Sequence, residues 1–230
     1  KGLLHGYLAG QAGARAILRV LSGDVNPSGK LAETYPLKYD DVPSAGSFPG
    51  EGKTVEYRES IFVGYRYYDT NGIDVLFPFG FGLSYTNFEY SDIELVNGGV
   101  SFSITNAGSV PGMEIAQMYV HCCSEAVFRP AKELKGFKKI FINPGEKKRV
   151  TINFDDITFR FYNSTSNEWE IEDADYDILI GASSNDIRLT VTTHIDGTNI
   201  EFPFDSAQLP SYFSGNVKAG DKAEFELLLG

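Results

Sequence analysis

Glutamates that could serve as a general acid and a general base gather beside a glycine-rich stretch of this chain. They are Glu51, Glu56 and Glu59. Hydrolysis of a glycosidic bond uses two carboxyl groups that rigid elements hold roughly 5 to 9 Å apart. The spacing of these glutamates selects no such pair, and acidic residues in a polar loop are usually solvated. We therefore assign no catalytic residue to this stretch.

Possible nucleophiles and metal ligands are few. Two adjacent cysteines, Cys122 and Cys123, directly follow His121. They could supply a nucleophile or metal ligands, but no second cluster of His or Cys completes either set. The other histidines, His5 and His194, have no neighbour at such a spacing. All three histidines are expected to be ordinary structural or surface residues.

The acidic run Asp173-x-Asp175-x-Asp177 has the alternation of a calcium-binding loop. Ile178 stands where the sharp turn of such a loop requires glycine. A solvated turn that leads into a strand at Tyr176 is the better interpretation. We expect no metal site and no cofactor.

An aromatic- and glycine-rich stretch, residues 57–86, has the composition of a junction between two domains. Side chains alternate from Ile61 to Tyr68, which predicts a strand that is covered on both faces. Arg66 on this strand needs a carboxylate or a set of carbonyls, because an unpaired buried charge costs several kcal/mol. The candidate partners are Asp24, Glu59 and Asp69.

The second half of this junction follows a turn at Asn71-Gly72. From Phe77 to Gly82 it alternates phenylalanines with one proline and two glycines. Proline lacks an amide donor and glycine permits positive φ, so regular structure is interrupted. We expect a rigid aromatic wedge that fills the seam between the two domains.

The first 54 residues contain the elements of an incomplete α/β unit. Residues 1–10 carry no start signal, and we expect the sequence to be a piece of a longer chain. Apolar residues at helical spacing predict a helix over 11–21 that ends at Gly23. A short strand is expected over 31–35, followed by a long surface loop over 36–54, which has no periodicity.

Beyond Phe88 the pattern changes to about eight short segments of alternating side chains. They span 88–95, 100–105, 114–120, 134–141, 148–154, 157–162, 176–180 and 187–193. Asn-Gly and Pro-Gly turn signals separate several of them. This pattern predicts an all-β sandwich of the immunoglobulin or fibronectin kind, with Trp169 in or beside its core.

Near the end of the chain, Asp221-x-x-Glu224 has the form of a capping box and predicts a short helix. The fold class is thus an α/β segment, the end of an α/β-sandwich domain, followed by an all-β sandwich. We divide the chain into 1–87, the α/β part with the junction, 88–195, the sandwich, and 196–230, a tail or linker.

Composition narrows the classes of function. The 230 residues are 42% hydrophobic, enough for a core, and a net charge of −11 would repel nucleic acid and anionic membranes. No run of about 18 apolar residues could span a membrane. The cysteines fit free thiols in a reducing, cytoplasmic compartment, and the sequon Asn163-Ser164-Thr165 is too common a triplet to overturn this. Secretion stays open, because a targeting segment would lie in the part of the chain that we expect to precede Lys1.

Several long motifs follow one another along the chain: GDVNPSGKL at 23–31, IFVGYRYYD at 61–69, FPFGFGLSYT at 77–86, GMEIAQMYV at 112–120, RPAKELKGF at 129–137 and GASSNDI at 181–187. In this order they resemble glycoside hydrolase family 3, from the end of its second, α/β-sandwich domain into its third, fibronectin-like domain. The resemblance covers roughly residues 1–195. It departs from the family at Ala9, Ala12, Ser60 and Phe81, where Pro, Glu, Gly and His are usual.

The resemblance implies a retaining β-glycosidase, commonly a β-glucosidase, with an aspartate nucleophile on a barrel domain and a glutamate acid/base on the second domain. Neither motif stands in this sequence, so no catalytic residue is carried over. Tyr57 and Glu59 are the candidates for reaching a bound substrate, although packing is the favoured role for both.

We therefore expect the non-catalytic portion of an enzyme that hydrolyses terminal β-linked glucose. Its partners would be a barrel domain or chain that carries the nucleophile, a β-glucoside substrate, and, as an open option, a second copy of itself. The alternative is a free-standing carbohydrate-binding or interaction module that descends from such an enzyme. Exposed aromatic rings that can stack on sugars would favour that alternative.

Overall fold

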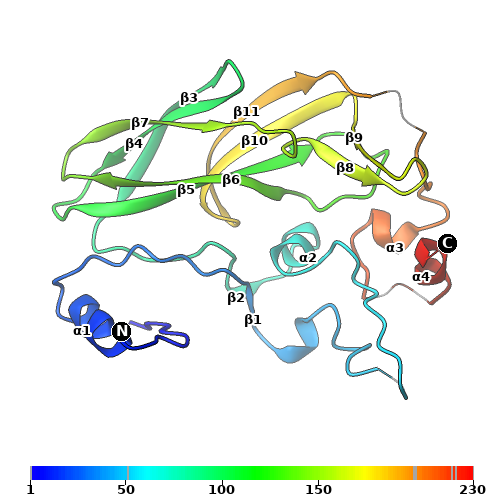
Figure 1. The fold of residues 1–230 in the computed structure, drawn as a ribbon, viewed down its shortest axis with the longest axis horizontal. Helices are drawn as coiled ribbons and strands as arrows, with labels where there is room; N and C mark the ends of the chain where they lie inside the picture. The colour runs from blue at the N-terminus through cyan, green and yellow to red at the C-terminus, as the bar shows by residue number, and fades with distance from the viewer. Residues whose placement is uncertain (1, 51, 199–200, 219, 221, 230) are drawn as a thin grey trace.

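Two facing antiparallel sheets form the largest part of the computed structural model, which describes residues 2–50, 52–198, 201–218, 220 and 222–229. They fill the upper half of the molecule in Figure 1. The first sheet has the strand order β11-β10-β5-β6 and the second has the order β3-β4-β7. The bounds are β3 Phe88–Val96, β4 Gly99–Asn106, β5 Gly112–Cys122, β6 Glu133–Ile142, β7 Lys147–Asn153, β10 Ala174–Ser183 and β11 Asp186–Ile195.

Alternation along the strands creates the core between these sheets. On β10, Tyr176, Ile178 and Ile180 point inward and are at most 1% exposed. Ala116 and Met118 on β5 are likewise fully buried. Successive side chains on a strand point to opposite faces, so the intervening residues lie on the outer face of the sheet. The prediction of an α/β segment followed by an all-β sandwich is confirmed.

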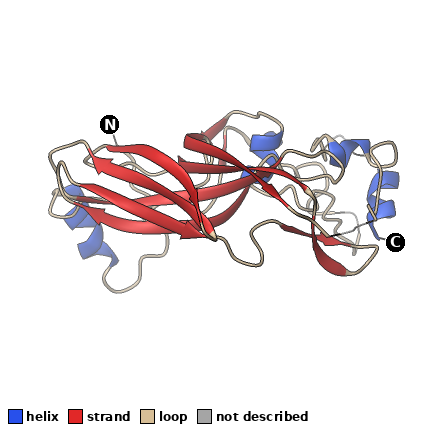
Figure 2. Ribbon diagram, turned by 90° about the horizontal axis from the view of Figure 1, so that it is seen from above, coloured by secondary structure: helices blue, strands red, loops and turns tan. Residues whose placement is uncertain are grey.

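Two further strands form a hairpin outside both sheets, β8 (Arg160–Asn163) with β9 (Glu168–Ile171). Figure 2 shows this hairpin near the C-terminal helices. The sequence pattern started β8 too early, missed β9, and wrongly placed Trp169 in or beside the core. Trp169 is 56% exposed. A two-stranded hairpin has no second sheet above it, and its tryptophan packs on Tyr162 and Arg160.

The segment before the sandwich is mostly irregular. Its elements are α1 (Gly13–Leu21), β1 (Tyr35–Pro36), the 3₁₀ turn η1 (Tyr39–Asp41), α2 (Tyr65–Thr70) and β2 (Val75–Phe77). The helix predicted over 11–21 is confirmed as α1. In the loop predicted over 36–54, the described residues 37–50 and 52–54 contain no helix or strand apart from η1. The strand predicted over 31–35 is reduced to β1, which pairs with β2.

The strand predicted over 61–68 is wrong, because helix α2 begins at Tyr65. Gly64, with φ of 57°, breaks the extended path just before it. Tyr67 and Tyr68 are both buried, and they are so as members of this helix rather than of a strand covered on both faces. The high β-propensity of the aromatic residues was therefore misleading. Arg66 lies 4.0 Å from Glu133, which was not among its three expected partners.

The tail packs back on this segment through a second hydrophobic cluster. Helix α3 (Pro210–Phe213) and helix α4 (Lys222–Leu229) lie at one end of the molecule in Figure 1. The buried members of the cluster are Phe62, Tyr67, Tyr68, Leu209, Tyr212 and Val217. The predicted C-terminal helix is confirmed, whereas the capping role of Asp221 lies outside the described residues. Glu224 accepts hydrogen bonds from the backbone N–H and hydroxyl of Ser211, at 2.9 and 2.7 Å, and so ties α4 to α3.

The glycosylation sequon lies in a protected place. Asn163 is 1% exposed, and its side-chain Nδ2 donates a hydrogen bond to the carbonyl of Glu201 at 2.9 Å. That nitrogen would have to be accessible to receive a glycan. Among the described residues, no helix combines the length and apolar character that a membrane crossing requires.

A fully buried asparagine should be critical for the sandwich. Asn106 accepts bonds from Thr86 and from the N–H of Gly108, and donates to the carbonyls of Val110 and Ile142. Asn106→Ala leaves several of these buried groups without partners and should lower the free energy of unfolding by about 2–4 kcal/mol.

Urea denaturation of the chain, followed by far-ultraviolet circular dichroism, measures this change. The exposed neighbour Asn87→Ala is the matched control and should change stability by less than about 0.5 kcal/mol. Equal effects of the two substitutions would contradict the assigned role.

Candidate functional site

Residues 65–82 pack against part of the outer face of the first sheet, with α2 lying below β5 and β6 in Figure 1. Gln117 on β5 is 3% exposed and is the centre of this contact. Its Nε2 donates to the carbonyl of Gly80 at 3.1 Å and to that of Ala182 at 2.8 Å. Its Oε1 accepts the hydroxyl of Tyr119 at 2.6 Å. One buried amide thus links the junction to two strands of the sandwich.

Aromatic rings complete this contact. Tyr65 stacks on Phe79 with 4.8 Å between ring centroids and meets Tyr119 edge-on at 5.8 Å. The N–H of Leu134 donates to the Tyr65 hydroxyl at 2.7 Å. We call Tyr65, Phe79, Gly80, Gln117 and Tyr119 the seam. The wedge predicted over 77–82 is confirmed, since Phe79 packs on Tyr65 and Gly80 bonds to Gln117 between the two parts of the chain.

Burial also fixes the protonation of the two seam tyrosines. It raises the pKa of Tyr119, and it raises the pKa of Tyr65 despite the opposing effect of the Leu134 N–H. Both hydroxyls therefore remain protonated at neutral pH. The protonated Tyr119 hydroxyl can therefore donate the hydrogen bond that Gln117 Oε1 accepts.

Two ion pairs flank the seam and join the same two parts of the chain. Lys132 lies 3.0 Å from Asp69, and Lys30 lies 3.1 Å from Glu114. All four side chains are at most 15% exposed. Removal of one partner from such a pair leaves a buried charge without compensation, which costs about 3–5 kcal/mol.

The substrate-binding candidates lie away from the seam. Tyr57 is 72% exposed. Glu59 is half-buried, and its Oε2 is buried without a hydrogen-bond partner among the described residues. Of the other glutamates considered, Glu56 pairs with Arg58 at 2.5 Å, and Glu51 lies outside the described residues. The roles of Tyr57 and Glu59 stay predictions.

A hollow of about 390 Å³ lies beside these residues. Its walls come from the loop at 46–50, from Thr54, Glu56 and Arg58, and from Lys222 on α4. Tyr212 on α3 donates a hydrogen bond to the carbonyl of Arg58 at 2.8 Å and so anchors the wall. The tail therefore helps to shape the loop region that could face a substrate.

Two groups of side chains in the described part of the chain have the composition of cation ligands. One is His121, Cys123 and Asp177, and the other is Asp173, His194 and Asp196. Sequence spacing offered His121 and Cys123 but gave no reason to add Asp177, which is 54 positions after Cys123. Only the pairing of β5 with β10 brings Asp177 to them.

Two family models match the chain in succession. The glycosyl hydrolase family 3 C-terminal domain matches residues 1–85, and the fibronectin type III-like domain matches residues 114–184. The chain belongs to glycoside hydrolase family 3. It corresponds to the C-terminal part of the family's proteins and not to their catalytic barrel, as the motif resemblance predicted.

Individual relatives agree with this assignment. Thermostable β-glucosidase B of Acetivibrio thermocellus is 50% identical over 208 residues, which cover 86% of this chain and 27% of the relative. An exo-α-(1→6)-L-arabinopyranosidase of Bifidobacterium longum is 43% identical over 202 residues, again 86% of this chain and 27% of the relative. The chain thus spans about a quarter of the length of these curated relatives.

Solved structures show the same fold. The family 3 β-glucosidase of Bifidobacterium adolescentis superposes with a TM-score of 0.81 at 36% identity, over 96% of this chain and 33% of that one. β-Glucosidase 3B of Thermotoga neapolitana, in complex with α-D-glucose, gives 0.76 at 41% identity, over 81% of this chain and 27% of that one.

A single methyl group should disrupt the seam. Gly80 has φ of 78°, and a Cβ at this position would collide with the side-chain amide of Gln117. Gly80→Ala combines the cost of a left-handed backbone with overpacking and should destabilise the chain by about 2–4 kcal/mol.

Thermal and urea unfolding of the chain measure the effect. Gly29→Ala is the matched control, because a Cβ there meets no atom within 4 Å and should be nearly neutral. A Gly80→Ala variant as stable as Gly29→Ala would show that the seam does not constrain the fold.

Proposed function

We propose that this chain is the non-catalytic C-terminal part of a retaining β-glycosidase that releases terminal β-linked glucose. The observation that carries the proposal is the seam, which fixes the end of the α/β domain to the fibronectin-like sandwich. The 50% identity to a β-glucosidase supports glucose as the sugar. Because two other relatives are arabinopyranosidases, the identity of the sugar is the part of the proposal that most needs a test.

The rest of the α/β domain and a barrel domain are the proposed partners. Helix α1 leaves Leu18 and Leu21 about two-thirds exposed, and Leu3 and Leu8 before it are still more exposed. Such apolar side chains need a cover. The missing elements of the α/β domain would supply it, and a second copy of this chain is the alternative cover.

The loop region would then face the barrel. Tyr57 lies uncovered, and Glu59 keeps one buried carboxylate oxygen free of partners among the described residues. Both features fit groups that meet the barrel or its bound substrate. We further propose a cytoplasmic location, since Cys122 and Cys123 are free thiols and the sequon is buried.

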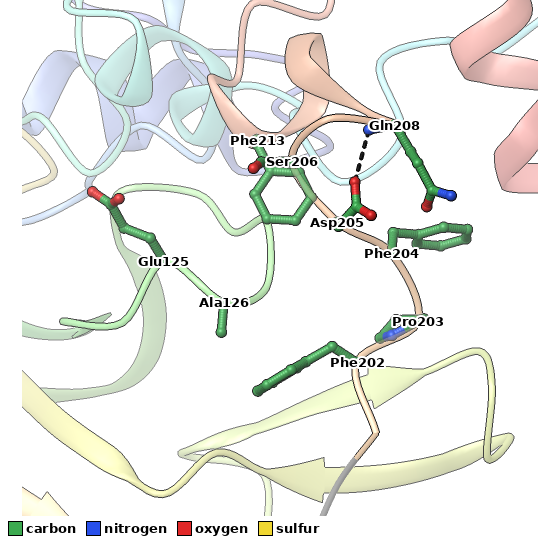
Figure 3. Close-up of a pocket in the computed structure, with 9 residues that line it drawn as sticks. All are labelled: Glu125, Ala126, Phe202, Pro203, Phe204, Asp205, Ser206, Gln208 and Phe213. Carbon is green, nitrogen blue, oxygen red and sulfur yellow. Dashed lines mark hydrogen bonds between the residues drawn. The ribbon is translucent and has the colours of Figure 1, made fainter.

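A carbohydrate-binding module is the second candidate, and exposed aromatic rings favour it. Tyr162 and Trp169 on the hairpin are 51% and 56% exposed and meet edge-on at 5.4 Å. Near this hairpin, a hollow of about 390 Å³ is bordered by Phe202, Phe204 and Phe213 (Figure 3). The Asp205 carboxylate in its wall is occupied by the N–H groups of Ala207 and Gln208. The guanidinium of Arg160 already lies over the Trp169 ring, 4.7 Å from its centroid. A sugar that stacked there would have to displace this guanidinium, so the architectural role is favoured over the binding module.

A chimera tests the proposed role. The 208 matching residues of thermostable β-glucosidase B would be replaced by this chain. The chimera should hydrolyse an aryl β-glucoside with kcat/KM within about tenfold of the parent, a loss below ~1.4 kcal/mol in transition-state stabilisation. The parent without these residues should be inactive, because its α/β domain is incomplete.

A folded chimera with no activity would contradict the architectural role. Comparison of aryl β-glucoside with aryl α-L-arabinopyranoside as substrates then tests the sugar. Because the barrel of the chimera comes from the relative, only a change in preference from the parent reports on this chain.

Tyr57 provides a finer test in the same chimera. Because it is exposed, Tyr57→Ala should change the stability of the chain by less than about 0.5 kcal/mol. It should nevertheless lower kcat/KM of the chimera at least about tenfold, through contact with the barrel or the substrate. Tyr162→Ala, a similarly exposed tyrosine on the hairpin, should leave kcat/KM unchanged.

The two substitutions also separate the two candidate functions. If the chain alone is retained on insoluble β-glucan, and Tyr162→Ala abolishes the retention, the binding module is supported. No retention, together with a loss of activity confined to Tyr57→Ala, supports the architectural role.

A further inference from the structure

Pairing of β5 with β10 brings three different metal-binding side chains together on one face of the first sheet. His121 stands directly opposite Asp177, and Cys122 stands opposite Tyr176. Cys123 follows directly after the end of β5, and its thiol lies near His121, whereas Cys122 packs against the core. The ligand atoms of His121, Cys123 and Asp177 all lie within 4.8 Å of one another.

The chemistry of this set matches zinc. An imidazole nitrogen, a thiolate sulfur and a carboxylate oxygen are the three ligand types of zinc sites, whereas calcium and magnesium require oxygen ligands. Bonds of about 2.0–2.3 Å to a tetrahedral zinc place its ligand atoms roughly 3.3 to 3.8 Å apart. Small side-chain rotations achieve this from the observed spacing. A thiolate and a carboxylate together also neutralise the charge of Zn²⁺.

One neighbouring hydrogen bond orients a ligand side chain, and another fixes the backbone of a second ligand. The hydroxyl of Thr192 on β11 donates to Asp177 Oδ1 at 2.6 Å and orients the carboxylate. The N–H of Cys123 donates to the carbonyl of Asp175 at 2.9 Å and keeps the end of β5 against β10. Partners of this kind raise metal affinity because they fix the orientation of the ligands.

We propose that His121, Cys123 and Asp177 bind one zinc ion, with water in the fourth position. The ion displaces the thiol proton of Cys123 to solvent, so binding strengthens as pH rises. The zinc ion joins the end of β5 to β10. From this end of β5 the chain continues to Lys132, whose ammonium pairs with Asp69 beside the seam. The second group, Asp173, His194 and Asp196, is exposed throughout and lacks a thiolate.

Cobalt absorption tests the proposal on the full 230-residue chain. The chain is produced without a polyhistidine tag, stripped with a chelator, kept reduced and titrated with Co²⁺. One equivalent should give a thiolate-to-cobalt charge-transfer band and the intense visible bands of tetrahedral Co²⁺, and one equivalent of Zn²⁺ should remove both. Cys123→Ser should abolish the charge-transfer band. His121→Ala and Asp177→Asn should weaken binding at least tenfold, and Thr192→Val about tenfold.

Two variants serve as matched controls. Cys122→Ser removes the adjacent thiol that faces the core, and His194→Ala removes the histidine of the second group; both should keep the full spectrum. Circular dichroism without metal tests whether each variant is folded. If Cys122→Ser is not folded, His194→Ala serves as the control by itself. The proposal is overturned if the native chain shows no charge-transfer band, if Cys123→Ser retains it, or if binding depends on His194 instead.

Discussion

The side-chain amide of Gln117 must satisfy its hydrogen bonds in a place that water does not reach, and the arrangement of the chain depends on this constraint. Its donors bind the carbonyls of Gly80 and Ala182, and its acceptor takes the Tyr119 proton. A buried amide without partners would cost several kcal/mol. The observed placement of the 77–82 segment meets the requirement through the carbonyl of Gly80, so the amide favours this orientation between the α/β part and the sandwich.

Side-chain periodicity predicted the sandwich because its strands alternate over long stretches and face one continuous core. It failed where a single backbone position decided the outcome. Gly64 turns the chain into α2 just where Ile61 to Tyr68 alternates. Tryptophan is a residue type expected in a core, but the hairpin that carries Trp169 belongs to neither sheet. Neither the return of Tyr212 onto Phe62 nor the approach of Asp177 to His121 leaves a signal in local sequence, because both depend on tertiary packing and strand register.

The candidate site likewise combines features that the sequence predicted with features that it did not. The seam could be predicted from its unusual density of rings and glycines, since few surface loops combine them. The polar centre of the seam could not, because Gln117 lies within an ordinary strand pattern. The exposure of Tyr57 and the unpartnered oxygen of Glu59 likewise emerge only in three dimensions. These features fit the proposed role of a part that braces a glycosidase whose chemistry is carried by another domain.

Turnover by the isolated chain is the most direct test of this account. Purified residues 1–230 would be incubated with a chromogenic aryl β-glucoside, and release of the aryl group would be followed over time. The account predicts no release above the buffer control at any chain concentration, because it assigns the nucleophile and the acid/base to parts outside this chain. Release that rises in proportion to the concentration of folded chain, and is lost when the chain is unfolded, would contradict it.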